Sequence, residues 1–255
     1  MFSDERRQQI SEILETQKFV HVTDLANRFF TSEATIRRDL EKLRKNGLLK
    51  RTYGGAVLLD GLDAEIPLIV REEERRVQKE LIAQTAAQLI QMDAVMIIDS
   101  SSTCGKLIPF LASRKPKTVI TNSPKTAIQL AQCGVAHIYS TGGFLRSSSL
   151  SYVGETARKM ISSYYVDILF FSCRGASIDF GLTDPSEEEA ELKRVMIQHS
   201  KVRVLMLDSS KFEKQGFTRL GDFSDIDYLI TEQRLSTAWL QHLDASGVQV
   251  LYPET

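Results

Sequence analysis

The chain has 255 residues, 42% of them apolar and 25% charged, which is typical of a globular protein with a sizeable core. No stretch reaches the roughly 18 uncharged apolar residues of a membrane helix, so we expect no membrane association. The charged start MFSDERRQQI lacks the apolar run of a secretory signal. Cys104, Cys133 and Cys173 are odd in number and widely separated, which favours a cytoplasmic protein over a disulfide framework or a zinc knuckle.

The net charge of −1 is unevenly distributed along the chain. Residues 1–57 hold 11 Lys and Arg against 8 Asp and Glu, whereas the remainder holds 21 against 25. The excess is concentrated at residues 28–51, with 8 basic against 3 acidic residues. A small basic head on a mildly acidic body indicates a polyanion-binding unit joined to a second domain.

The first 57 residues have the pattern of three short helices followed by a β-hairpin. Apolar spacing predicts helices at about residues 4–16, 22–29 and 33–45, the last with Ile36, Leu40 and Leu43 on its buried face. Asn46-Gly47 ends the third helix, since both residues tolerate positive φ. Strands at 48–51 and 56–59 flank a β-turn at 52–55. This order predicts a winged helix-turn-helix over residues 1–58.

The outward face of the third predicted helix is small at its start and basic further on. Ala34, Arg38 and Lys45 point almost opposite to the buried residues, with Thr35 and Arg37 on the flanks. A small residue permits close approach to the major groove, and Arg pairs bidentately with guanine. A solvated surface helix would carry similar arginines, so the prediction also depends on the helix order, the hairpin and the charge asymmetry. The candidate DNA contacts are Ser32, Ala34, Thr35, Arg37, Arg38, Lys42, Lys45, Lys50, Arg51 and Tyr53.

The segment TSEATIRRDLEKLRKNGLLKRTYGGA, residues 31–56, strongly resembles the N-terminal signature of the DeoR family of bacterial transcriptional regulators. The resemblance implies a winged-helix DNA-binding domain with Thr35, Arg37 and Arg38 in the recognition helix. Two positions depart from the family pattern. Lys18 stands where Gly is usual, and Tyr53 replaces a His at the tip of the wing.

The pattern changes after the hairpin. Residues 59–76 are interpreted as a linker and the helix that leads into the second domain, because Gly61 and Pro67 interrupt the pattern and REEERR then starts a helix reaching about residue 91. Beyond it, strands are predicted at 95–99, 118–122, 137–141, 167–173, 202–208, 228–231 and 248–252, and helices at 103–113, 124–133, 155–163, 186–199 and 236–245. This alternation predicts right-handed crossovers and a mainly parallel α/β domain over residues 77–255.

Small polar loops end several of the predicted strands: Asp99-Ser100-Ser101-Ser102-Thr103, Thr121-Asn122-Ser123, Ser140-Thr141-Gly142-Gly143 and Asp208-Ser209-Ser210-Lys211. Free N–H groups at helix starts, together with hydroxyls and a lysine, form an anion cradle. Each loop alone would be an ordinary helix cap. Their repetition at one sheet edge predicts a pocket for a small polyhydroxylated phosphate ester.

The stretches DSSST, VITNS, TGG, GLTDPSEEEAELKR and DSSKF resemble the sensor domain of the DeoR family, which is similar in fold to ribose-5-phosphate isomerase and glucosamine-6-phosphate deaminase. The resemblance implies a phosphorylated sugar or sugar-derived metabolite as effector. Cys173-Arg174-Gly175 falls where many members carry an Asp-Gly pair, so the usual contact is not expected there, and Arg174 would instead meet an acidic or second phosphate group. The candidate effector contacts are Asp99, Ser100, Ser101, Ser102, Thr103, Thr121, Asn122, Gly142, Gly143, Arg174, Glu188 and Lys211.

The leading functional prediction is a DNA-binding repressor of a carbohydrate-utilisation operon that acts as a dimer or tetramer, because paired half-sites mirror protein symmetry. The alternative is a sugar-phosphate isomerase or deaminase with a DNA-binding head, in which Asp99 and Glu188 would transfer protons. A body that only oligomerises is a third possibility. The acidic run Glu187–Glu189 fits a solvated helix start, and the four His residues show no ligand spacing, so we predict no metal, cofactor or catalytic residue.

Overall fold

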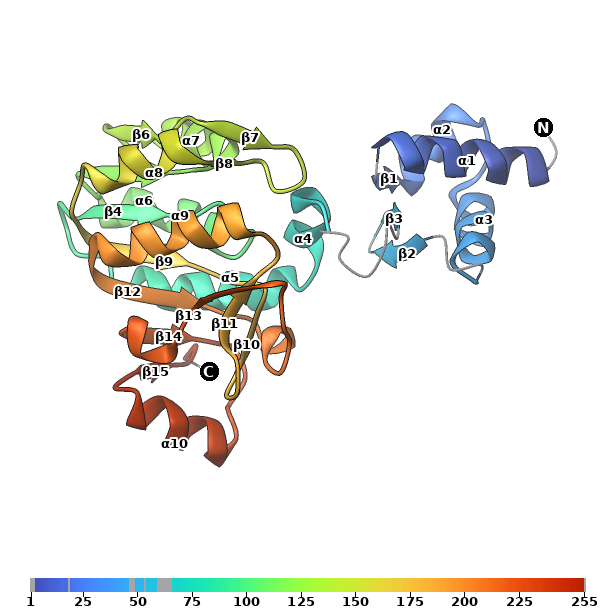
Figure 1. Cartoon of the computed structure of the whole chain (residues 1–255). Helices are drawn as coiled ribbons and strands as arrows, with labels where there is room; N and C mark the ends of the chain where they lie inside the picture. Colours follow the sequence, from blue (N-terminus) through green and yellow to red (C-terminus); the bar gives the residue numbers. More distant parts are fainter. Residues whose placement is uncertain (1–2, 18, 46–48, 53, 59–65, 255) are drawn as a thin grey trace. The chain divides into compact units, whose positions relative to one another are not determined.

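The computed structural model describes residues 3–17, 19–45, 49–52, 54–58 and 66–254. It divides into two compact units, the N-terminal unit Met1–Glu74 and the C-terminal unit Arg75–Thr255, shown in Figure 1. The expected helix stop at Asn46-Gly47 and the wing-tip residue Tyr53 lie outside the described residues. No helix in the described part of the chain is long and apolar enough to cross a membrane.

The N-terminal unit has the predicted winged helix-turn-helix order, with one additional strand. Strand β1 pairs antiparallel with β3, which pairs with β2 in turn. A strand of three residues whose partner lies more than 30 residues downstream leaves no periodic signal, which is why β1 was not predicted. The elements are α1 (Ser3–Gln17), β1 (Phe19–His21), α2 (Val22–Arg28), α3 (Glu33–Lys45), β2 (Leu49–Thr52), β3 (Gly55–Leu58) and α4 (Leu68–Glu73).

The core of the N-terminal unit joins its first three helices. Ile10 and Leu14 of α1 are buried with Leu25 of α2 and with Ile36 and Leu40 of α3. The buried direction of α3 is the one that its apolar spacing predicted. The opposite face of α3 is therefore directed away from the core.

The C-terminal unit is built on a parallel sheet. Within residues 66–254, seven strands pair in the order β15-β14-β12-β9-β4-β5-β6, and every pairing is parallel. All seven were predicted from apolar runs, to within two residues at each end. The strands are β4 (Val95–Ile98), β5 (Thr118–Thr121), β6 (Ile138–Ser140), β9 (Val166–Phe171), β12 (Ser200–Met206), β14 (Tyr228–Ile230) and β15 (Gln249–Leu251).

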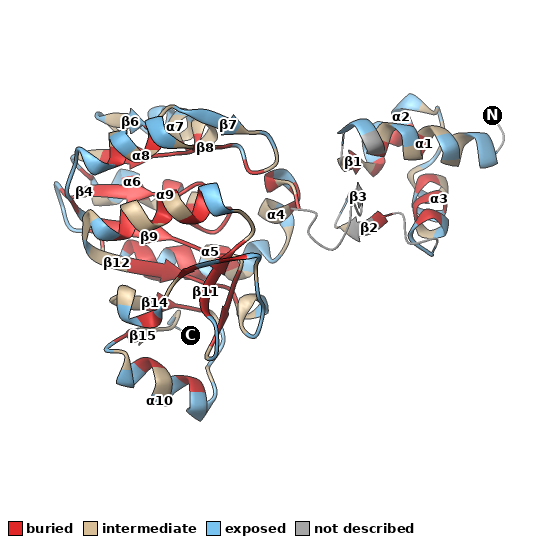
Figure 2. Cartoon of the chain, viewed as in Figure 1, coloured by how far each residue is buried: buried red, intermediate tan, exposed pale blue. Residues whose placement is uncertain are grey.

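Helices cover both faces of this sheet, with a separate apolar core on each side. Ile82 of α5, Leu111 of α6 and Leu130 of α7 belong to one core, whereas Ile161 of α8 and Met196 of α9 belong to the other. Figure 2 shows the central strands buried between helices whose outer faces are exposed. The helices are α5 (Arg76–Ala87), α6 (Ile108–Arg114), α7 (Pro124–Gln132), α8 (Glu155–Ser162), α9 (Glu187–Gln198) and α10 (Thr237–Ala245), with 3-10 turns η1 (Cys104–Leu107), η2 (Ser209–Lys211) and η3 (Phe223–Asp225).

Two local features differ from the sequence prediction. The helix expected from residue 71 to 91 is interrupted, because Arg75 has φ +53 and separates α4 from α5. The antiparallel strands of the C-terminal unit were not predicted, since each of them has only three or four residues. They are the hairpin β7 (Phe144–Arg146) and β8 (Ser151–Val153), and the small sheet of β10 (Gly175–Ser177), β11 (Gly181–Asp184) and β13 (Thr218–Gly221).

Candidate functional site

The start of α3 is capped by the residue that precedes it. The Thr35 backbone N–H donates to Ser32 Oγ at 3.2 Å, and the two hydroxyl oxygens lie 2.9 Å apart. Ser32, Ala34, Arg37 and Arg38 are exposed, and Thr35 is half-buried. The small, hydroxyl-bearing first turn of α3 is thus open to solvent, as a major-groove helix requires.

Positive charge on α3 is only partly neutralised within the unit. Arg37 pairs with Glu33 at 2.6 Å, and Arg44 pairs with Glu41 at 2.7 Å. Arg38, Lys42 and Lys45 are exposed and form no ion pair within the part of the chain that the structure describes. These three cations remain available for a polyanion. Lys50 and Arg51 lie on β2, and Tyr53 lies outside the described residues.

An ion pair that sequence reasoning missed fixes α3 against α1. Asp39 is buried, and its Oδ2 lies 2.6 Å from Arg6 Nε while its Oδ1 lies 3.5 Å from Arg7 Nη1. A signal was available, because Asp39 falls on the buried side of α3 between Ile36 and Leu40. A buried carboxylate there requires a cation from a neighbouring helix.

Two loops at the carboxyl edge of the sheet form the same turn. Asp99 Oδ1 accepts from the Ser101 backbone N–H at 2.9 Å and from its hydroxyl at 2.5 Å. Asp208 Oδ1 accepts from the N–H and hydroxyl of Ser210 at 3.1 and 2.5 Å. The turns follow β4 and β12, which flank β9. Asp99 Oδ2 also accepts from the N–H of Ser172, directly after β9, so the three strand ends form one polar edge.

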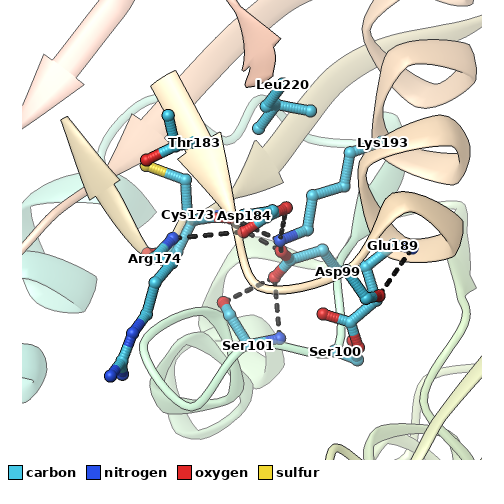
Figure 3. A network of polar contacts seen from close by, with 12 residues as sticks. Asp99, Ser100, Ser101, Cys173, Arg174, Thr183, Asp184, Glu189, Lys193 and Leu220 are labelled. Atoms are coloured by element: carbon cyan, nitrogen blue, oxygen red, sulfur yellow. Dashed lines mark hydrogen bonds and ion pairs between the residues drawn. The ribbon is translucent and has the colours of Figure 1, made fainter. Parts of the chain in front are cut away.

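A buried lysine lies behind this edge, as Figure 3 shows. Lys193 of α9 donates through Nζ to the Ser172 carbonyl and to Asp184 Oδ2, both at 2.8 Å, and lies 3.7 Å from Asp99 Oδ2. Asp184 Oδ1 accepts from the Arg174 backbone N–H at 3.1 Å. Lys193 and Asp184 were not among the predicted site residues, although both belong to the stretch GLTDPSEEEAELKR.

Burial and charge act in opposite directions on this cluster. Burial raises the pKa of Asp184 to about 6, although Lys193 opposes the shift. Burial alone would lower the pKa of Lys193, but Asp184, Asp99 and Glu189 outweigh it and raise that pKa above its usual value. Lys193 therefore stays protonated, and the pKa of Asp184 lies closer to neutrality than that of an ordinary aspartate.

The inward-facing acid at the start of α9 is Glu189. Its Oε1 accepts from the Ser151 hydroxyl at 2.8 Å and lies 3.1 Å from Arg146 Nη1, joining α9 to the β7–β8 hairpin. Glu188, the residue carried over from the family pattern, is exposed at this helix start.

Asn122, directly after β5, has hydrogen-bond partners for the nitrogen of its side-chain amide but not for the oxygen. Nδ2 donates to Ser100 Oγ at 3.4 Å and to the Tyr152 carbonyl at 3.3 Å. Oδ1 is buried and has no hydrogen-bond partner among the described residues. A buried acceptor without a donor is costly, and a ligand hydroxyl would satisfy it.

The remaining predicted residues differ in how they meet this edge. Gly142 and Gly143 have φ +61 and +110, and a Cβ on Gly143 would lie 2.7 Å from the Val153 carbonyl, so the loop requires glycine. Ser102, Thr103 and Thr121 are buried, and Ser102 Oγ accepts from Lys79 Nζ at 3.1 Å, a contact that sequence reasoning missed. Arg174 and Lys211 are half-buried, and the Arg174 side chain extends away from Lys193 in Figure 3. The described residues contain no cluster of His, Cys, Asp and Glu suited to a metal ion.

The fold defines a helix-turn-helix protein with a second, α/β domain: a basic helix is exposed in the winged helix-turn-helix, and polar loops lie at the edge of the α/β sheet. Residues 6–61 match the model of the DeoR-like helix-turn-helix domain, and residues 74–233 match that of the DeoR C terminal sensor domain. The chain therefore belongs to the DeoR family of transcriptional regulators, as its motifs predicted.

Its relatives are named as regulators. The chain is 37% identical over 253 residues to the uncharacterized HTH-type transcriptional regulator YulB of Bacillus subtilis, covering 98% of this chain and 96% of YulB. It is 30% identical over 251 residues to a putative aga operon transcriptional repressor of Escherichia coli O157:H7, covering 98% and 93%. It is 33% identical over 214 residues to an L-fucose operon activator of Haemophilus influenzae, covering 84% and 86%.

Solved structures align only distantly. Ribose 5 phosphate isomerase A from Neisseria gonorrhoeae aligns with TM-score 0.40 and 15% identity, over 56% of this chain and 54% of that chain. The beta subunit of eIF2B from Chaetomium thermophilum aligns with TM-score 0.42 and 17% identity, over 63% and 49%. Similarity at this level has no bearing on activity.

Proposed function

We propose that this chain is a repressor of a carbohydrate-utilisation operon that binds operator DNA through α3. A phosphorylated sugar or sugar-derived metabolite, bound at the carboxyl edge of the C-terminal sheet, would change the affinity of the protein for its operator. The observation that carries the proposal is the outward face of α3, where Arg38, Lys42 and Lys45 are exposed without an ion pair in the described part of the chain.

The chemistry of α3 supports a duplex as partner. Cations that are not neutralised within the protein can replace the counterions of DNA phosphates, which supplies affinity. Base contacts come from the first turns of such a helix, where Thr35, Arg37 and Arg38 lie. Of these, Arg38 is the better candidate for guanine, because Arg37 already pairs with Glu33.

The polar edge of the C-terminal sheet supports an anionic polyhydroxylated ligand. The turns at Asp99 and Asp208 present serine hydroxyls on both sides of β9, and the acceptor Asn122 Oδ1 suits a sugar hydroxyl. Gly142 has φ +61 and a Cβ built on it would have no atom within 4 Å, so its backbone is open to an approaching anion. Arg174 and Lys211 would supply positive charge for an acidic group.

Regulation requires that the ligand bind two states of the protein with different affinity. We propose a dimer or tetramer, in which residues 77–255 oligomerise and bind the effector, and in which the ligand changes the spacing of two helix-turn-helix units. The named relatives include a repressor of an aga operon and an activator of an L-fucose operon, which supports a carbohydrate operon as target.

Selection from a random pool of duplexes by the full-length protein tests DNA binding. We expect enrichment of a common, two-fold related sequence whose binding weakens steeply as salt rises. A screen of phosphorylated sugars for a raised melting temperature then identifies the effector, which must also change the affinity for the selected duplex. A protein that enriches no sequence would refute the proposal.

A second candidate, a sugar-phosphate isomerase or deaminase with a DNA-binding head, is favoured by the two buried carboxylates Asp184 and Asp99, which lie 2.8 and 3.7 Å from Lys193 Nζ. The pKa of Asp184, raised by burial to about 6, is suited to proton transfer near neutral pH. Conversion between aldose and ketose phosphates, lost in Asp184→Asn, would establish the enzyme. Ligand binding without turnover would leave the regulator as the function.

A further inference from the structure

Phe30 follows α2 at a position that normally belongs to glycine. The Thr31 N–H donates to the Ala26 carbonyl at 3.0 Å, and the Phe30 N–H donates to the Asn27 carbonyl at 3.3 Å. This pair of bonds is the Schellman closure of a helix, which places the residue after the C-cap in the left-handed region. Phe30 has φ +47 accordingly, whereas Gly, or sometimes Asn, is the usual residue there.

The side chain of Phe30 does not compensate for this backbone strain. It is 97% exposed, the largest exposed fraction among the large hydrophobic side chains of the described residues. A ring in water contributes no packing energy, and a Cβ in the left-handed region raises the energy of the turn. The N-terminal unit would therefore be more stable with Gly at this position. Stability does not explain the phenylalanine.

The position of Phe30 is close to the start of α3. It lies two residues before the N-cap Ser32, so their Cα atoms are at most about 7 Å apart along the chain. In a helix-turn-helix complex the first residues of the second helix approach the base edges, while the first helix crosses the phosphate backbone. The turn that joins the two helices is then beside one strand of the duplex.

We infer that Phe30 packs its ring against the apolar face of a deoxyribose at the edge of the major groove, and so positions α3 in the groove. The inference rests on the proposed DNA binding. Charge distinguishes DNA from a second copy of this unit as the occupant. Arg28 and Arg38 near the turn are exposed, and residues 1–57 carry more basic than acidic residues. Two such surfaces repel each other, whereas DNA complements them.

Substitution of Phe30 tests the contact, because stability and affinity should change in opposite directions. Phe30→Gly and Phe30→Asn both suit a left-handed residue, so each should raise the melting temperature of the N-terminal unit by a few degrees in calorimetry of the full chain. Both should weaken binding to the duplex selected by the wild-type protein by roughly tenfold. Phe30→Tyr keeps the ring and should bind like the wild-type protein.

The salt dependence separates this contact from an ionic one. Phe30→Gly removes an apolar contact, so the slope of log affinity against log salt should stay unchanged. Lys42→Ala should make that slope less steep by the amount that corresponds to about one phosphate contact. Unchanged affinity in Phe30→Gly, or an equal loss in Phe30→Tyr, would overturn the inference and leave the proposed function standing. A wild-type protein that enriches no duplex would overturn both.

Discussion

At the scale of single residues, the C-terminal unit depends on Lys193. Its ammonium group contacts Asp184 at 2.8 Å and Asp99 at 3.7 Å, and all three side chains are buried. A buried charge is tolerated only when it is paired. One cation therefore compensates two carboxylates that would otherwise repel each other at the edge of the sheet.

Lys193→Met should destabilise the C-terminal unit by about 3–5 kcal/mol, because it leaves two carboxylates in the protein interior without their cation. Urea denaturation followed by circular dichroism measures the change. Lys159→Met is the matched control, since Lys159 is an exposed lysine of α8 that pairs with Glu155 at 3.2 Å, and we expect little effect there. Equal stabilities of the two variants would contradict the assigned role of Lys193.

The raised pKa of Asp184 gives a pH dependence with a definite sign. Between its ordinary value of 3.8 and its folded value of about 6, the folded state binds more protons than the unfolded state. The contribution of Asp184 to stability therefore falls as pH rises through this window, and is constant above it. The unfolding free energy of the wild type minus that of Asp184→Asn should therefore become smaller from about pH 4 to pH 6. A difference that increases over that range would be inconsistent with the raised pKa.

At the scale of elements, an ion pair holds the buried face of α3, and the opposite face is exposed to solvent. Asp39 ties its buried face to Arg6 of α1, while Arg38, Lys42 and Lys45 project from the opposite side. The N-cap at Ser32 fixes where the helix begins. The orientation of the exposed basic face of α3 is therefore set by the ion pair on its buried face and by its N-cap.

Asp39→Ala should lower the stability of the N-terminal unit by about 2–4 kcal/mol, because the Arg6 guanidinium loses its buried partner. Calorimetry of the full chain resolves the unfolding transition of this unit. Glu33→Ala removes a carboxylate from the same helix at an exposed pair, and should have little effect. If both variants melt like the wild type, Asp39 does not fix α3.

Arg38→Ala should cost roughly 1–3 kcal/mol of binding free energy at one base pair of the selected duplex and relax specificity there. Lys42→Ala should instead weaken binding to all duplexes alike, because a phosphate contact carries no sequence information. Gel-shift titrations against single-base variants of the duplex measure both effects. A uniform loss in Arg38→Ala would assign that residue to the backbone.

The success of sequence prediction differs between kinds of element. Helices such as α3 and buried strands such as β9 have periodic or continuous apolar patterns, which the fold preserves. The strands β1, β7 and β8 have three residues each, and their pairing depends on the approach of distant segments. The polar loops after the strands were identified by composition, but Lys193 was not, because a lysine on a helix usually faces solvent. Its burial follows from the three-dimensional position of α9.

At the scale of the whole molecule, the proposed receptor and the proposed DNA-binding helix belong to separate units, Met1–Glu74 and Arg75–Thr255. Occupancy of one unit can affect the other only through two states that both sites sense. Substitutions at the proposed ligand site should therefore abolish the response to the ligand without changing the affinity for DNA.

Asn122→Ala should bind the selected duplex like the wild type but lose the change in affinity caused by the sugar phosphate, because it removes the buried acceptor Oδ1. Fluorescence anisotropy of labelled duplex, with and without the ligand, measures both properties. Gln132→Ala, which removes an exposed amide at the end of α7, should respond normally. A full response in Asn122→Ala would place the ligand elsewhere.

The contacts of Lys193 have a mechanical consequence. Asp99 directly follows β4, Ser172 directly follows β9, and Asp184 is the last residue of β11. The ammonium group of Lys193 contacts all three and so links the main sheet to the small antiparallel sheet. A ligand that displaced the Asp99 turn would also disturb the contacts of the ammonium group that holds the end of β11. Ligand binding at the edge of the main sheet would in this way reach the small antiparallel sheet through a single side chain.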